Sequence, residues 1–237
     1  MEPADDIEGL WRQYRELENG GDRAAMLSAL AAFVPRIEGA PSDIRQTWID
    51  ECLRASSDPN DGFRIRAPLF QRVLFPELKT RYLAGDAASA RALAGLSQEL
   101  YRYAAGWAEL GWPGEVDLWK EAYRRDPTSD LARAKLLAST ARFIQYTLHE
   151  LPAGVLYGTD GATVEQCDDL LVELEFFRGL LTSVETEEFQ PLVELASFHY
   201  PNYREYLLQN RKQGYSAFLD EHGRGPTVDR RGRPTNR

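Results

Sequence analysis

The residue pair best suited to acid–base chemistry is His149 followed by Glu150. A histidine can act as a general base, and a nearby carboxylate can orient its ring. Adjacent residues on a helix point about 100° apart, however, and the HExxH zinc pattern is absent because residue 153 is alanine. A histidine is also typical of a helix C-terminus, where it interacts with the last carbonyl groups. An enzyme of unrecognised type with a His149/Glu150 site is therefore an alternative interpretation.

A second polar and aromatic group surrounds Pro201. His199, Tyr200 and Tyr203 belong to it, and such groups can line binding grooves. Tyrosines also commonly pack one ring face and leave the hydroxyl in water. Tyr200 and Tyr203 are candidate partner-binding residues, while the enzymatic alternative requires His149 and Glu150 to converge with His199 or Tyr157.

The sequence contains no recognisable cofactor or metal motif. No two of the three histidines have metal-ligand spacing, and Cys52 and Cys167 are not part of a CxxC pair. Gly154, Gly158 and Gly161 are not followed by the Gly-Lys-Ser or Gly-Lys-Thr of a phosphate-binding loop. We therefore expect no cofactor and no metal, and we expect both cysteines to be small buried residues.

Acidic side chains are concentrated in one stretch of the chain. Residues 160–195 contain ten acidic residues and one basic residue, so this stretch carries the same −9 as the whole chain. An acidic face attracts cationic partners and speeds association at low salt. A solvated helix face has the same pattern, and both interpretations stay open. The candidate partner-binding residues here are Glu165, Asp168, Asp169, Glu173 and Glu175.

The composition argues against two classes of partner. A net charge of −9 and a pI near 5.0 disfavour direct nucleic-acid binding, which needs clustered lysine and arginine. No apolar run approaches the roughly 18 residues that span a bilayer, and the N-terminus is acidic where a signal peptide would be basic. We expect no membrane association, a cytoplasmic location and a basic protein as partner.

Apolar residues recur at helical spacing along most of the chain, so the expected fold class is all-α. Pro76 should kink or split its helix because proline lacks a backbone donor. The arginine-rich tail over 223–237 should be disordered, and its positive charge would let it fold onto the acidic stretch. The predicted helices cover residues 6–19, 22–35, 42–53, 68–83, 86–110, 115–125, 129–150 and 163–181, followed by a helical region over 189–218 that breaks at Pro201.

Residues 115–130, with the sequence EVDLWKEAYRRDPTSD, resemble the second helix of a tetratricopeptide repeat. Trp119, Ala122 and Pro127 fall at the aromatic, small and closing-proline positions of that motif. The preceding residues do not carry the signature of the first helix, although residues 85–90 resemble the turn of another unit. The resemblance implies antiparallel helix hairpins in an irregular solenoid or a bundle.

The sequence predicts a single all-helical domain over 1–222, with 56–62 as a candidate sub-boundary. The leading hypothesis is a non-enzymatic protein-binding module that holds a basic partner, such as an adaptor or an immunity protein that neutralises a toxin. A further alternative is a helical bundle that binds an apolar ligand or assembles as a homo-oligomer.

Overall fold

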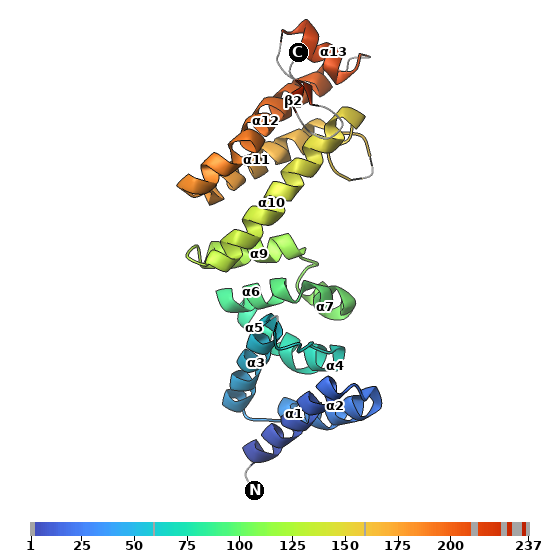
Figure 1. Cartoon of the computed structure of the whole chain (residues 1–237), viewed down its shortest axis with the longest axis vertical. Helices are drawn as coiled ribbons and strands as arrows, with labels where there is room; N and C mark the ends of the chain where they lie inside the picture. Colours follow the sequence, from blue (N-terminus) through green and yellow to red (C-terminus); the bar gives the residue numbers. More distant parts are fainter. Residues whose placement is uncertain are drawn as a thin grey trace. The chain divides into compact units, whose positions relative to one another are not determined.

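The computed structural model describes residues 3–58, 60–158, 160–209, 213–223, 227–228 and 234–235. This part of the chain is all-α, as the sequence predicts, apart from two strands of two residues each. It divides into two compact units, unit 1 over Met1–Thr128 and unit 2 over Ser129–Arg237 (Figure 1). The expected single domain over 1–222 therefore differs from the observed division. The boundary follows the Asp126-Pro127 turn and not the 56–62 loop.

Unit 1 is a series of helices joined by short connections. The expected helix over 86–110 is divided at Leu96 and Tyr103, where the backbone leaves helical geometry. The elements are α1 (Pro3–Gly20), α2 (Arg23–Glu38), α3 (Ser42–Ser57), α4 (Ala67–Leu69), η1 (Phe70–Leu74), α5 (Phe75–Leu83), α6 (Ala87–Gly95), α7 (Ser97–Arg102), α8 (Ala104–Glu109) and α9 (Glu115–Arg125).

Aromatic side chains fill the space between α1, α2 and α3. The Trp11 ring meets Trp48 edge to face, with 4.9 Å between ring centroids, and lies 5.4 Å from Phe33. Phe63, from the loop after α3, also meets Trp11 edge to face, with 5.3 Å between ring centroids. Such offset contacts contribute about 0.5–1.5 kcal/mol each beyond the burial of the rings. This cluster holds the first three helices of unit 1 together.

The expected disturbance at Pro76 takes the form of a π-helical turn. In η1 the Phe75 amide donates to the carbonyl of Phe70, five residues earlier, so the helix is wider than an α-helix there. A proline in a regular helix leaves one carbonyl without its donor and clashes with it. The wider turn directly before Pro76 accommodates the ring, and α5 continues to Leu83 without a break.

The segment that resembles a tetratricopeptide helix forms α9, and it packs against α6. Ala90 of α6 and Ala122 of α9 are completely buried, and Trp119 is buried beside Ala122. Small residues let two helix axes approach closely, which is the role that the motif gives them. The sequence between α6 and α9 forms the short helices α7 and α8. The irregular solenoid that the resemblance implies stays a prediction.

Unit 2 is built around three long helices. The helix α11 packs against both α10 and α12, and α10 also contacts α12 (Figure 1). Most of the predicted tail, from residue 224, lies outside the described residues, except for two short antiparallel strands. The elements are α10 (Asp130–Glu150), η2 (Leu151–Ala153), α11 (Val164–Leu180), α12 (Ser183–Leu208), α13 (Tyr215–Glu221), β1 (Thr227–Val228) and β2 (Pro234–Thr235).

The predicted helix break at Pro201 is wrong, because α12 continues through both Pro191 and Pro201. Proline removes one donor from a helix but leaves the remaining backbone bonds available. Beside Pro201, the Asn202 side-chain amide donates to the Phe198 carbonyl at 2.7 Å. Packing of α12 against α10 and α11 stabilises the helix across the proline.

The close approach of α6 and α9 predicts a position-specific loss of stability. Ala122→Leu should destabilise unit 1 by about 1–3 kcal/mol because the added atoms have no space. All five tryptophans lie in unit 1, so urea unfolding followed by tryptophan fluorescence reports on this unit. Val116→Leu, at an exposed position of α9, is the control and should leave the midpoint unchanged. An unchanged midpoint for Ala122→Leu would contradict the packing described above.

Candidate functional site

The helix α11 begins with a reciprocal cap. The Thr163 hydroxyl accepts a hydrogen bond from the backbone N–H of Gln166 at 3.2 Å. In return, the side-chain oxygen of Gln166 accepts one from the backbone N–H of Thr163 at 3.1 Å. This cap fixes the start of the helix, and the buried residues fix its rotation about its axis. The residues of α11 that are buried in unit 2 are Cys167, Leu170, Leu174, Phe177 and Leu180.

The outward face of α11 carries the acidic residues that the sequence singles out. Val172 lies in the middle of this face and is 71% exposed. It follows Asp168 by four residues and precedes Glu175 by three, so the three side chains are neighbours on the helix surface. We call this surface the acidic face of α11. Its exposed acidic members are Glu165, Asp168, Asp169 and Glu175, and Glu173 is half-buried at its edge.

Sequence reasoning did not single out Val172. The signal was available, because an apolar residue stands on the polar arc of an amphipathic helix. Cys167, by contrast, is buried as predicted, and so is Cys52 in unit 1.

Two arginines neutralise part of the acidic face. Arg204 of α12 makes a two-pronged contact with Asp168, with its Nε 2.6 Å from Oδ1 and its second nitrogen 3.3 Å from Oδ2. Arg178 forms an ion pair with Glu175 along the helix. Glu165 and Asp169 have no ion pair in the described part of unit 2. The negative charge available to a partner is therefore concentrated at the N-terminal half of the face.

Two neutral hydroxyl groups donate to the same face. Tyr157 donates to Asp169 at 2.9 Å, and Thr140 of α10 donates to Glu173 at 3.3 Å. Burial and the hydrogen bond to Asp169 raise the pKa of Tyr157 to about 12, so the phenol stays protonated. Both contacts orient a carboxylate without removing its charge.

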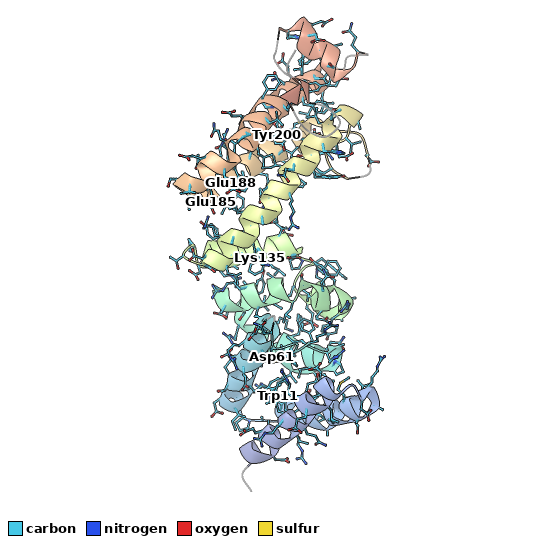
Figure 2. The ribbon with its side chains drawn as sticks, viewed as in Figure 1. Trp11, Asp61, Lys135, Glu185, Glu188 and Tyr200 are labelled. Carbon is cyan, nitrogen blue, oxygen red and sulfur yellow. The ribbon has the colours of Figure 1, made fainter. Side chains whose placement is uncertain are left out.

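Tyr200 and Tyr203 are not surface residues, which corrects their assignment as partner-binding residues. Tyr200 is completely buried and Tyr203 is 2% exposed. The Tyr200 hydroxyl lies 2.7 Å from the Thr147 hydroxyl of α10, and burial raises its pKa well above the usual value. The two tyrosines are thus part of the packing inside unit 2, and Figure 2 shows Tyr200 in the half of α12 away from Glu185 and Glu188.

The start of α12 is a second acidic region, and one of its residues has a structural role. The Glu185 carboxylate accepts a hydrogen bond from the backbone N–H of Thr182 at 2.9 Å. It accepts another from the guanidinium group of Arg133, on α10, at 2.7 Å. The hydrogen bond from Arg133, followed by that from the Thr182 backbone, lowers the pKa of Glu185 to about 2. Glu188 lies near Glu185 at this end of α12 (Figure 2) and is exposed. The sequence signal for Glu185 is the Thr-x-x-Glu capping pattern.

The pair of the enzymatic alternative is brought together at the end of α10. His149 Nδ1 lies 2.9 Å from Glu150 Oε1, and the His149 side chain is 54% exposed. Neither residue lines a described cavity. His199 is buried in unit 2, and the Tyr157 hydroxyl donates a hydrogen bond to Asp169. The arrangement supplies an oriented imidazole on an exposed part of the surface, outside the three cavities described.

The described residues offer neither a metal site nor a membrane-spanning helix. Within the described residues, no three histidine, cysteine, aspartate or glutamate side chains group in a way that could hold a metal ion. No helix among the same residues has the length and apolar character needed to cross a membrane. No protein-family model, no curated protein sequence and no solved structure matches this chain. The candidate site therefore depends on geometry alone.

The half-buried ion pair between Arg133 and Glu185 at the start of α12 predicts a pH dependence. Because the pKa of Glu185 is lowered from 4.5 to about 2, its contribution is present above pH 4.5 and is lost as the pH falls toward 2. Glu185→Gln should reduce hydrogen-exchange protection of α12 on the order of tenfold at pH 5–7, allowing for its partial exposure. The difference from wild type should shrink at acid pH.

Protection factors corrected for intrinsic exchange provide the measurement for Glu185→Gln. Glu187→Gln, an exposed change on the same helix end, is the control and should follow the wild type at every pH. If both variants lose protection equally, Glu185 has no special structural role.

Proposed function

We propose that unit 2 is a non-enzymatic protein-binding module and that the acidic face of α11 holds a basic partner. The observation that carries the proposal is that Val172 is exposed and is surrounded by carboxylate side chains on the surface of α11. A solvated helix face needs no valine at its centre. A contact surface gains from one, because covering a valine contributes about 1.5–3 kcal/mol.

The charges around Val172 provide specificity and fast association. Rim charges of one sign steer a partner of the opposite sign and mainly change the association rate. Arg204 on Asp168 shows that a guanidinium group fits this surface with two hydrogen bonds. A partner would therefore present an apolar side chain flanked by arginines, with Asp169 and Glu165 as its carboxylate acceptors.

The proposal covers two kinds of protein. An adaptor would hold a basic segment of another protein, and an immunity protein would cover the basic surface of a toxin. Both fit a cytoplasmic location, where the thiols of Cys52 and Cys167 persist without a disulfide. An enzymatic role for His149 and Glu150 has no comparable support, because the pair lies outside the described cavities.

Charge reversal on the face tests the electrostatic part of the proposal. The double variant Glu165→Lys and Asp169→Lys should abolish capture of a basic protein from a lysate of the source cell at low salt. The matched control reverses Glu16 and Asp43, two exposed acidic residues of unit 1, and changes the net charge by the same amount. We expect the wild type and the control variant to capture the basic protein at low salt and to release it at about 0.5 M salt.

Equal capture by both double variants would contradict the choice of face, and an absence of any captured protein would count against the proposed function. The arginine-rich tail is the competing occupant. If the tail covers the face, removing residues 224–237 should increase capture by the wild-type face and leave the face variant unchanged.

The apolar centre of the face makes a separate prediction. Val172→Ser should weaken binding of the captured partner about tenfold, mainly through faster dissociation, because the methyl groups are lost and the charges are kept. Surface plasmon resonance separates the two rates. Val184→Ser, at a valine of α12 that is 75% exposed, is the control with the same chemical change. A changed association rate with unchanged dissociation for Val172→Ser would contradict an apolar contact at this position.

A further inference from the structure

Unit 2 contains a recess of about 280 Å³ between η2, the C-terminal half of α12 and the start of α13. Its floor is formed by Leu151, His199 and Leu219, which are at most 1% exposed. Its rim includes Pro152 and Ser216, which are exposed. Gly214 and Tyr215 complete the wall. The size is just below the range for small-ligand pockets, which is about 300–1,000 Å³.

His199 is the unusual residue of this recess. The side chain is completely buried, and Nε2 has no hydrogen-bond partner. Buried polar atoms are nearly always paired, and leaving one unpaired costs about 1–3 kcal/mol. Burial lowers the pKa of His199 to about 4, so the ring is uncharged at neutral pH. The Nε2 atom of His199 is therefore removed from water without the hydrogen bond that normally compensates for burial of a polar atom.

The contacts of Nδ1 limit what Nε2 can offer. The Tyr215 hydroxyl lies 3.1 Å from Nδ1 and 3.4 Å from the backbone oxygen of His199. If the hydroxyl donates to the backbone oxygen, Nδ1 carries the ring proton and Nε2 is an acceptor. If it donates to Nδ1, Nε2 carries the proton and is a donor. A hydroxyl group on a ligand can satisfy Nε2 in either case, since it both donates and accepts.

We propose that this recess binds a small uncharged molecule that has an apolar body and one hydroxyl group, such as a simple phenol or alcohol. Leu151, Leu219 and Pro152 provide apolar surface, and the lining contains no aspartate, glutamate, lysine or arginine. An anion would find no cation here, and a cation would find no carboxylate. The hydroxyl would pair with His199 Nε2, while the apolar body would lie against the leucines.

Binding requires a small opening of the recess toward the ring. The Nε2 atom has less than 1 Å² of exposed surface in the free protein. Rim residues such as Ser216 are exposed, so their side chains can change rotamer without loss of a buried contact. The inference is independent of the acidic face of α11, because it uses none of the residues of that face.

The test uses the full-length protein with ¹⁵N-labelled histidine and three probes of similar size. Phenol has the required hydroxyl, toluene lacks it, and benzoate carries a charge. Long-range proton–nitrogen spectra resolve His149, His199 and His222 and report the state of each ring nitrogen. Phenol should shift the His199 Nε2 signal saturably with a millimolar dissociation constant. Toluene and benzoate should bind at least tenfold more weakly.

Variants connect the signal to the recess. Phenol binding, measured by saturation-transfer NMR, should fall at least tenfold in His199→Phe, which keeps a ring and removes Nε2. Ser216→Phe should have the same effect by covering the rim, and its exposed position avoids a change in the core. His149→Phe makes the same chemical change on the exposed surface and should bind phenol like the wild type.

Three results would overturn the proposal. Toluene could bind as well as phenol, phenol could shift the three histidines in parallel without saturation, or no probe could change the His199 signal up to its solubility limit. Circular dichroism of each variant checks that the fold is retained. If His199→Phe does not fold, the Ser216→Phe variant and the probe comparison still decide the result.

Discussion

A carboxylate cannot be buried without a partner, and this constraint fixes how α11 lies in unit 2. The helix has acidic residues on one arc and apolar residues on the other, so only one rotation about its axis removes the apolar arc from water. That rotation leaves Glu165 and Asp169 in solvent. The constraint explains the acidic face without any partner. It does not explain Val172, because any polar residue would satisfy it equally well.

The strength of the acidic face depends on contacts that the sequence does not reveal. A count over residues 160–195 gives one base against ten acids. In the folded unit, Arg204 and Arg133 come from outside this stretch and bind Asp168 and Glu185. The two pairs join residues that are 36 and 52 positions apart in the sequence. The charge pattern along a single helix predicts contacts only between residues three or four positions apart, so it could not reveal these pairs. The field toward solvent is therefore weaker and more localised than the composition indicates.

The helical fold was largely predictable because apolar spacing is a local property. The outcome at prolines depends on tertiary packing. Local rules indicate a break at Pro201, and a break would place Tyr200 and Tyr203 in an exposed loop region. Because α12 continues, Ala196, Tyr200 and Tyr203 lie on one helix face at spacings of four and three, and all three are buried. One wrong boundary thus changed the expected role of two residues.

The two orphaned polar atoms in the described residues, Trp48 Nε1 and His199 Nε2, differ in what surrounds them. Trp48 meets Trp11 edge to face, and an aromatic face is a weak acceptor that an indole N–H can use. An indole nitrogen is only a donor, so a neighbouring aromatic face is a group of the right kind for it. The imidazole nitrogen of His199 is an acceptor in one tautomer, and an aromatic face offers no proton to it. In the other tautomer Nε2 is a donor, so a hydroxyl group, which both donates and accepts, suits the position beside His199 in either case. The sequence alone could not show this, because it depends on how α12 and α13 meet.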